Sequence, residues 1–180
     1  MKLTKTLLDD CFILQPDVFT DERGYFLETF NQKKFDELTN TKEHFVQDNF
    51  SSSKRGVLRG LHYQLNFPQG KLISVVAGNI FDVAVDLRKT SKTFGKWFGL
   101  EISAENKSQM WIPRGFAHGF LVLSETADVQ YKTTDFYHPE DEKCILWNDS
   151  DVNIKWPSVV APILSGKDRG GMTFKMAETF

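Results

Sequence analysis

The chain has 180 residues, with 22 lysines and arginines against 24 aspartates and glutamates, so its formal net charge is only −2. This length suits one domain, and a nearly neutral balance gives no global field that would attract nucleic acid. The 16 phenylalanines, with recurrent valine and isoleucine, are typical of strands. We therefore expect one all-β domain over residues 1–180, with a core at about 20–150 and a C-terminal wrap over 151–180.

The cysteines and the N-terminal segment indicate a reducing compartment. Cys11 and Cys144 lack the close spacing of a zinc site and the density of a disulfide-rich secreted domain. The first ten residues lack the apolar core of a signal peptide, and no apolar run approaches the roughly 18 residues of a membrane span. We expect a soluble, cytoplasmic protein without membrane contact.

The first predicted elements are a strand and a short helix. Residues 24–30 alternate, with Phe26, Glu28 and Phe30 on one face, which predicts a strand that carries one acid among aromatic side chains. Residues 32–38 predict a helix, which is too short to organise a core.

Two apolar runs follow, at residues 71–77 and 80–87. The Gly78-Asn79 dipeptide between them suits the positive φ angles of a tight turn, so we predict a hairpin. Further strands are expected at residues 99–102, 108–112, 119–123, 129–134 and 145–147. Many short antiparallel strands without a repeat predict a sandwich or jelly roll, over which residues 151–180 wrap as loop and short helix.

Three residues on β-prone runs have the chemistry for proton removal beside a carbonyl. His62 could act as the base, because imidazole titrates close to neutral pH. Lys71 could hold the developing enolate oxygen by its charge, and Tyr131 could return a proton from the opposite side. The hypothesis requires that the fold bring all three together.

A catalytic histidine needs a carboxylate that fixes its tautomer, and the sequence offers Asp168, Asp82 and Asp86 without choosing among them. A lone histidine on an apolar strand is more often a hydrogen-bonded structural residue, although the Arg59-Gly60 step before His62 would let a ligand approach closely.

Other residues suit either ligand contact or a structural role. His118 would either touch a ligand or pair with a buried acid such as Asp82. Arg23, Arg59 and Lys167 stand beside glycines, where a cation could grip a phosphate or simply be solvated. Tyr137, Phe136 and Trp147 could stack on a flat base or belong to the core.

Six ordered motifs together resemble one known family, the dTDP-4-dehydrorhamnose 3,5-epimerases. The motifs are Asp21-Glu22-Arg23-Gly24-Tyr25-Phe26, Gln47-Asp48-Asn49-Phe50-Ser51, Leu58-Arg59-Gly60-Leu61-His62, Asp82-Val83-Ala84-Val85-Asp86-Leu87-Arg88, Ile112-Pro113-Arg114-Gly115-Phe116-Ala117-His118-Gly119-Phe120 and Leu164-Ser165-Gly166-Lys167-Asp168. They extend over nearly the whole chain, from Asp21 to Asp168.

The resemblance implies a cupin-type jelly-roll β-sandwich with a few short helices. It implies a homodimer in which an N-terminal strand crosses to the partner and helps to build its pocket. The implied reaction inverts carbons 3 and 5 of dTDP-4-dehydro-6-deoxy-D-glucose to give dTDP-4-dehydro-L-rhamnose, on the route to dTDP-L-rhamnose for surface polysaccharide. Both carbons flank the keto group at carbon 4, so one base and one enolate-stabilising cation can serve both.

The resemblance also implies site residues. It makes His62 the proton acceptor, Asp168 its partner, Tyr131 the proton donor and Lys71 the enolate stabiliser. It places Tyr137 against the thymine ring. The other residues expected to contact the nucleotide sugar are Arg23, Phe26, Glu28, Gln47, Asp48, Asn49, Arg59, His118, Glu142 and Lys167.

We expect neither a metal nor another cofactor. Metal-binding cupins carry a second histidine two positions after the first, where this chain has Gln64, and His62 with His118 falls short of three or four ligands. The alternatives are a 3-epimerase or a 3,4-ketoisomerase on a related dTDP-4-keto-6-deoxy sugar, a non-catalytic sugar-binding cupin, and a metal-dependent cupin oxygenase, which the missing ligands disfavour.

Overall fold

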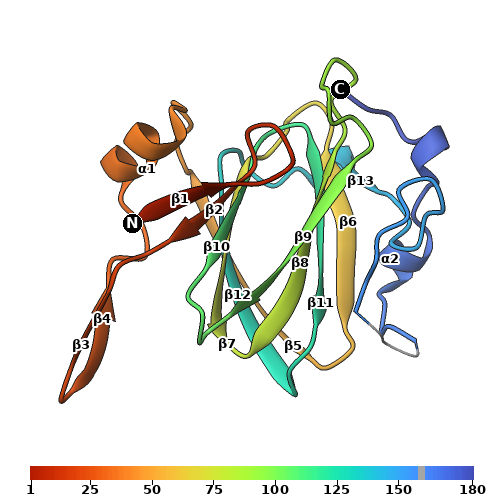
Figure 1. Cartoon of the computed structure of the whole chain (residues 1–180). Helices are drawn as coiled ribbons and strands as arrows, with labels where there is room; N and C mark the ends of the chain where they lie inside the picture. Colours follow the sequence, from red (N-terminus) through yellow and green to blue (C-terminus); the bar gives the residue numbers. More distant parts are fainter. Residues whose placement is uncertain (158–160) are drawn as a thin grey trace.

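The computed structural model describes residues 1–157 and 161–180, and its strands form two facing antiparallel sheets (Figure 1). The six-stranded sheet contains, in spatial order, β1 (Lys2–Lys5), β2 (Phe12–Gln15), β10 (Gln109–Ile112), β7 (Lys71–Ala77), β12 (Thr126–Thr133) and β5 (Gln47–Lys54). The five-stranded sheet contains β13 (Glu142–Cys144), β6 (Leu58–Gln64), β11 (Phe116–Val122), β8 (Asn79–Asp86) and β9 (Trp97–Ser103). The predicted all-β, cupin-type sandwich is confirmed.

The helical segments are short, as predicted. Helix α1 (Gln32–Thr39) begins at the Asn31 cap and adds one residue to the predicted range, and α2 (Gly166–Arg169) follows the Ser165 cap. Two 3-10 turns, η1 (Pro139–Asp141) and η2 (Phe174–Met176), complete the set. Among the residues that the structure describes, no helix has the length and apolar character that a bilayer crossing requires.

The core consists of a layer between the two sheets and a second layer outside the five-stranded sheet. Ile73, Met110 and Phe120 belong to the inner layer. Val83 and Val85 of β8 face the other way and pack under the C-terminal segment, where they meet partly buried side chains such as Trp156, Phe174 and Phe180. Both faces of β8 are therefore buried, and Asp82 lies on the face toward the other sheet.

The hairpin predicted at Gly78-Asn79 is wrong. Strand β7 belongs to the six-stranded sheet and β8 to the five-stranded sheet, so the dipeptide carries the chain across the core. Gly78 does have a positive φ of 77°, and a Cβ there would lie 2.0 Å from the Thr126 carbonyl oxygen. Gly78 is needed where the chain crosses from one sheet to the other. Such a crossing and a tight turn both call for a glycine with a positive φ, so the local sequence does not distinguish them.

Two other predicted strands differ in their limits. Strand β4 (Gly24–Leu27) ends before Glu28, whose carboxylate bonds to Asn31 and Lys34 at the start of α1. The strand predicted at residues 145–147 lies earlier in the chain, as β13, and Ile145 makes only an isolated bridge to Met172.

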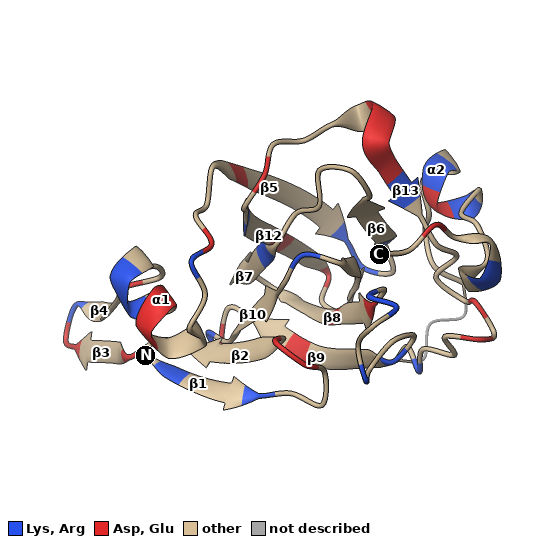
Figure 2. Cartoon of the chain, turned by 90° about the horizontal axis from the view of Figure 1, so that it is seen from above, with Lys and Arg blue, Asp and Glu red and all other residues tan. Residues whose placement is uncertain are grey.

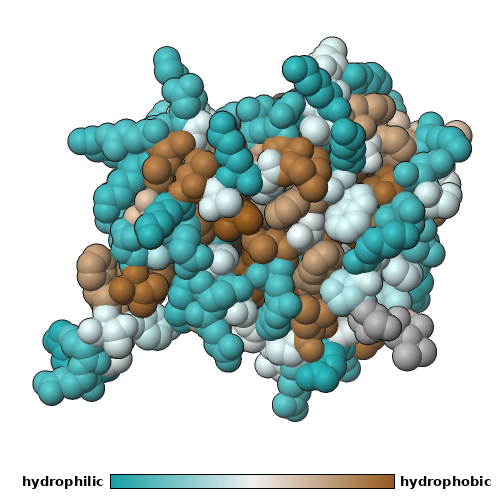
Figure 3. Space-filling view, in the orientation of Figure 1, coloured by the Kyte–Doolittle hydropathy of each residue, from teal (hydrophilic) through white to brown (hydrophobic). Residues whose placement is uncertain are grey.

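Strand β4 pairs with β3 (Val18–Asp21) in a separate hairpin that projects from the body of the molecule (Figure 1). Its aromatic side chains are exposed, Phe26 by 69% and Phe19 by 64%. The hairpin is hydrophobic toward the body and hydrophilic at its tip (Figure 3). Elsewhere, acidic and basic residues are interspersed over the ribbon (Figure 2).

Candidate active site

A cavity of about 340 Å³ lies between the two sheets and is lined mostly by polar side chains. Its position follows from strand alternation. On β5, every second residue from position 47 faces inward, and on β12 Tyr131 faces inward with Val129. The lining residues are Gln47, Asn49, Ser51, Arg59, His62, Tyr63, Gln64, Gln69, Lys71, His118, Phe120, Tyr131, Tyr137, Glu142 and Lys167.

His62 forms a close pair with one of the three candidate carboxylates. Its Nε2 lies 2.6 Å from Oδ1 of Asp168. The same carboxylate accepts bonds from the Gly60 amide, at 3.1 Å, and from the Ser165 hydroxyl, at 2.6 Å. Burial opposes ionisation of Asp168, but the bonds from His62 and Ser165 outweigh it and hold its pKa well below the usual range. Asp168 is therefore an anion fixed behind the imidazole ring.

The other two acids serve elsewhere. Asp82 Oδ1 lies 2.7 Å from Nε2 of His118; the carboxylate is fully buried and the histidine is 7% exposed. The pairing with Asp82 is the structural role that the sequence offered for His118. The His118 ring also lines the cavity. It lies there because β11 pairs with β6 and sets His118 opposite His62. Asp86, the last residue of β8, accepts a bond of 2.9 Å from Arg88.

Lys71 ends in the cavity and is only 9% exposed. Burial lowers the pKa of its ammonium group to about 8, against the opposing effects of Glu142 and Asp82. An ammonium group in such a site is stabilised by any negative charge that develops beside it. Lys71 thus has the environment that an enolate-stabilising cation requires.

Tyr131 is brought into the same cavity by β12. Burial raises the pKa of its phenol, Glu142 raises it further, and Arg59 opposes both. The phenol stays protonated near neutral pH and can donate a proton. The structure thus brings His62, Lys71 and Tyr131 to one cavity from three different strands.

Glu142 connects several groups at the mouth of the cavity. Its Oε1 lies 3.7 Å from Nδ1 of His62, and its Oε2 accepts a bond of 2.7 Å from the Tyr137 hydroxyl and pairs with the Lys167 ammonium. Burial raises the pKa of Glu142, but the bonds from Lys167 and Tyr137 outweigh it and lower the pKa overall. Glu142, Tyr137 and Lys167 are all among the residues that the family resemblance places in contact with the nucleotide sugar.

The remaining candidates divide into two groups. Gln47, Asn49 and Arg59 line the cavity, and Arg59 bonds to the Ser53 hydroxyl at 3.0 Å. Asp48 faces away from it and pairs with Lys132 on the outer side of the sheet. Arg23, Phe26 and Glu28 lie on or just after the projecting hairpin, outside the cavity of their own chain.

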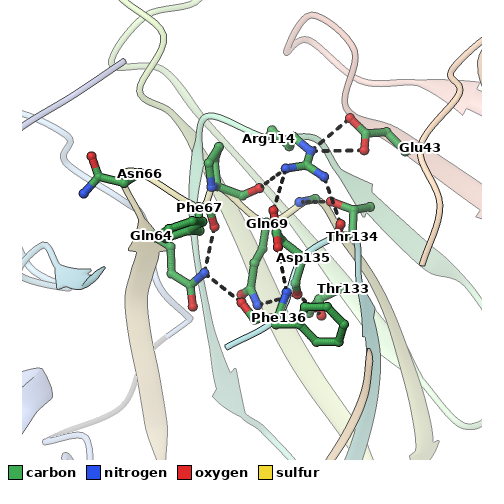
Figure 4. A network of polar contacts seen from close by, with 12 residues as sticks. Glu43, Gln64, Asn66, Phe67, Gln69, Arg114, Thr133, Thr134, Asp135 and Phe136 are labelled. Carbon is green, nitrogen blue, oxygen red and sulfur yellow. Dashed lines mark hydrogen bonds and ion pairs between the residues drawn. The ribbon is translucent and has the colours of Figure 1, made fainter. Parts of the chain in front are cut away.

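Arg114 supports the rim of the cavity, a role that the sequence did not reveal (Figure 4). Its guanidinium donates to Glu43, to the Pro68 carbonyl at 2.7 Å and to the Thr134 carbonyl at 2.9 Å. It thereby ties together three loops that precede or follow cavity residues such as Gln69. The one signal for Arg114 in the sequence is its position between Pro113 and Gly115, in the motif that contains His118.

One trio of potential metal ligands occurs in the described part of the chain, because ligand atoms of His62, Cys144 and Asp168 lie within 4.8 Å of one another. Thiolate is the ligand form of cysteine, whereas burial raises the pKa of the Cys144 thiol to about 12. Asp168 already accepts bonds from His62, Ser165 and Gly60. This environment suits a hydrogen-bonded pair better than a metal site, and metal independence stays a prediction.

Comparisons with known proteins show the family of this chain. The family model described as dTDP-4-dehydrorhamnose 3,5-epimerase matches residues 5–176. A dTDP-4-dehydrorhamnose 3,5-epimerase of Pseudomonas aeruginosa is 56% identical, covering 100% of this chain and 99% of the relative.

Two crystal structures are also similar. The dTDP-4-dehydrorhamnose 3,5-epimerase of Elizabethkingia anophelis has a TM-score of 0.94 at 57% identity, covering 97% of each chain. The Legionella pneumophila dTDP-6-deoxy-D-glucose-3,5-epimerase, which holds dTDP-4-keto-L-rhamnose, has a TM-score of 0.96 at 50% identity, covering 98% of this chain and 94% of that one. With matches this long in sequence and fold, the chain belongs to the dTDP-4-dehydrorhamnose 3,5-epimerase family of isomerases.

Proposed function

We propose that this enzyme inverts carbons 3 and 5 of dTDP-4-dehydro-6-deoxy-D-glucose and releases dTDP-4-dehydro-L-rhamnose. The observation that carries the proposal is the meeting of an imidazole, a buried ammonium group and a buried phenol in one cavity, from His62, Lys71 and Tyr131. These are the base, the oxyanion partner and the acid that stepwise inversion beside a ketone needs. No metal or other cofactor takes part in this mechanism.

Each inversion proceeds through an enolate. With Nε2 facing Asp168, Nδ1 of His62 takes the proton from carbon, and the C–H electron pair moves into the enolate. The oxygen at carbon 4 then carries negative charge, which the Lys71 ammonium stabilises. Tyr131 gives its phenolic proton to the opposite face of the carbon, so that the configuration inverts. Asp168 keeps the imidazole oriented and stabilises its charged form.

The mouth of the cavity suits the nucleotide diphosphate. Arg59 and Lys167 are cations on its lining that can bind phosphate oxygens, and the half-exposed ring of Tyr137 can stack on thymine. Gln47, Asn49, His118 and Glu142 supply further polar contacts to the sugar.

The active form in this proposal is a homodimer in which the β3–β4 hairpin reaches the partner's cavity. The exposed apolar residues of the hairpin support this, because a monomer would leave Phe19 and Phe26 in water. Arg23, Phe26 and Glu28 would then contact substrate in the second subunit. Mixing His62→Asn chains with Arg23→Ala chains should recover activity that neither variant has alone. If the two variants form mixed dimers and the mixture is still inactive, the hairpin does not contribute to the partner's cavity.

The proposal places the enzyme in the cytoplasm, on the route to dTDP-L-rhamnose. Cys11 and Cys144 are buried free thiols, which fits a reducing compartment. The activity is tested by incubation with dTDP-4-dehydro-6-deoxy-D-glucose and a reductase specific for the L-lyxo product. Reductase turnover that depends on this enzyme is expected. Its absence, or a product inverted at carbon 3 alone, would contradict double inversion.

Replacement of Tyr131 by phenylalanine should impair product formation more than proton abstraction. His62 can still remove a proton and exchange it with solvent in this variant, but no acid remains on the opposite face. Deuterium exchange into recovered substrate, compared with the rate of product formation, measures the two steps separately. Equal losses in both rates would contradict the assignment of Tyr131 as the acid.

A further inference from the structure

The segment that carries Tyr137 belongs to no helix or strand. It comprises residues 134–138, between β12 and η1. Under the proposed function, the half-exposed ring of Tyr137 is the surface on which thymine stacks. A segment outside the sheets would sample many conformations unless side chains hold it, because ordering each residue has an entropic cost. The position of the ring therefore depends on what holds the main chain of residues 134–138.

Gln64 holds the main chain on both sides of Tyr137. Its side-chain nitrogen donates a bond of 3.1 Å to the Phe136 carbonyl and one of 2.7 Å to the Phe67 carbonyl (Figure 4). Its side-chain oxygen accepts a bond of 2.8 Å from the main-chain N–H of His138. The side chain is only 3% exposed, so water competes little for these bonds. The residues before and after Tyr137 are thus bonded to one amide group.

Two further glutamines bond to the same segment. The side-chain oxygen of Gln47 accepts a bond of 3.1 Å from the main-chain N–H of Tyr137. The side-chain nitrogen of Gln69 donates a bond of 2.9 Å to the Asp135 carbonyl. All three glutamines line the cavity. Four consecutive residues, 135–138, therefore each have a main-chain group bonded to a glutamine side chain.

Glutamine suits position 64 because one amide group both donates and accepts. The two carbonyl oxygens that it meets can only accept, and the main-chain N–H can only donate, so neither a carboxylate nor an apolar side chain could form all three bonds. The amide is also neutral. Gln64 and His62 lie two residues apart on β6 and share a face, so a charged side chain at position 64 would alter the pKa of the base.

The outer end of the Tyr137 ring is fixed as well. Its hydroxyl donates a bond of 2.7 Å to Oε2 of Glu142. All of these bonds join groups of the protein itself, so they need no ligand in order to form. A binding surface that is already ordered loses little freedom when its ligand binds, and its affinity is higher for that reason.

We propose that Gln64 is a positioning residue for the nucleotide, a role that rests on the proposed function because it acts through the stacking ring of Tyr137. Together with Gln47 and Gln69, it keeps residues 134–138 in the binding conformation in the free enzyme. Gln64 is not among the residues that the family resemblance places at the nucleotide sugar. Its loss should weaken binding of the nucleotide and leave proton transfer beside the ketone unchanged.

Calorimetric titration with dTDP, which has the base and the diphosphate but no sugar, tests this role. We expect Tyr137→Ala to weaken dTDP binding by about 10- to 100-fold, the usual effect of losing one aromatic stacking contact. Gln64→Met, of similar length, should weaken it by about 10-fold, because residues 134–138 must then be ordered on binding. In the Tyr137→Ala background, Gln64→Met should have no further effect, because no ring remains to be positioned.

The matched control is Gln15→Met. Gln15 also donates a side-chain bond to a main-chain carbonyl, that of Asn106, but it lies outside the cavity, so this variant should bind dTDP as the wild type does. With the nucleotide sugar as substrate, Gln64→Met should raise KM by a factor similar to its loss of dTDP affinity and leave kcat unchanged.

Hydrogen exchange of the wild-type enzyme tests the same role without a substitution, and so holds even if Gln64→Met does not fold. The main-chain N–H groups of Tyr137 and His138 are bonded to Gln47 and Gln64, so both should be protected in the absence of dTDP. Rapid exchange in the free enzyme that slows only with dTDP would mean that the nucleotide orders these residues, and would overturn the proposal.

Other outcomes separate this role from the proposed function. Wild-type dTDP affinity in Gln64→Met or in Tyr137→Ala would overturn the positioning role. An equal loss from Gln64→Met with and without the Tyr137 ring would also overturn it, since Gln64 would then contact the ligand directly. So would a fall in kcat with an unchanged KM. In each case the epimerase assignment stands. A wild-type enzyme that binds dTDP but inverts neither carbon would contradict the proposed function alone.

Discussion

The His62→Asn variant should lose deuterium exchange with solvent at both carbons that flank the ketone. In the proposed mechanism one imidazole serves both positions, so its loss should remove both exchanges together. We expect turnover to fall by about 10² to 10⁴-fold, the usual contribution of a positioned base. Proton NMR of the substrate in D₂O measures the exchange at each carbon directly.

The fold should survive this change. Asparagine retains a polar group beside Asp168, whose carboxylate keeps its bonds to Ser165 and to the Gly60 amide. The matched control is His44→Asn, an exposed histidine outside the cavity, which should exchange at the wild-type rate. If His62→Asn kept wild-type exchange at either carbon, His62 would not be the base for that position.

The Lys71→Met variant should lose nearly as much activity and yet gain stability. Removing the oxyanion partner costs about 3 to 4 kcal/mol of transition-state stabilisation in comparable sites, or about 10²- to 10³-fold in kcat. Burial of the ammonium group opposes folding, as its lowered pKa of about 8 indicates, and methionine of similar length removes that cost. We expect a higher Tm by calorimetry together with the lost turnover.

The pH dependence gives an independent check on Lys71. The folded enzyme loses the Lys71 proton as the pH rises through about 8, whereas the unfolded chain keeps it to about 10.5. The kcat/KM of the wild type should therefore fall above about pH 8. Between about pH 8 and about pH 10.5 the stability of the folded state should rise with pH, because the unfolded chain binds more protons there and the cost of burying the ammonium charge is removed.

The exposed lysine variant Lys92→Met is the control for both effects and should change neither Tm nor turnover appreciably. Two results would contradict the proposed environment of Lys71. One is a Lys71→Met protein that melts at a lower temperature than the wild type, and the other is a wild-type kcat/KM that stays constant up to pH 9.

Local sequence patterns predicted the fold class well but could not predict how strands associate. Short apolar runs between glycine-bearing turns, together with the phenylalanine content, identified β7, β9, β10 and β12 to within a few residues, since β-branched and aromatic residues favour strands. The Gly78-Asn79 dipeptide predicts a hairpin where the chain instead crosses between sheets, because a positive φ is a local property and sheet membership is not. Strand β5, with the polar sequence QDNFSSSK, has inward side chains that face a cavity and so lacks an apolar signal.

The site shows the same limit. The types of residue needed for proton transfer could be chosen from the sequence, and the structure brings His62, Lys71 and Tyr131 together. Residue chemistry alone could not choose between Asp168 and Asp82, and the family resemblance favoured Asp168. The structure shows each of these acids beside a different histidine, Asp168 at His62 and Asp82 at His118. Arg114 supports the site through hydrogen bonds to residues far along the chain, such as Thr134, which leave no local pattern. Ser165, in contrast, bonds to Asp168 three residues later in a capping box, which is a local sequence pattern.

The most direct measurement of the central claim follows wild-type enzyme with dTDP-4-dehydro-6-deoxy-D-glucose in D₂O by NMR. We predict deuterium at both carbon 3 and carbon 5 and a product of L-lyxo configuration. Deuterium at one carbon only, or at neither, would contradict an epimerase in which one imidazole, one ammonium group and one phenol act on both sides of the ketone.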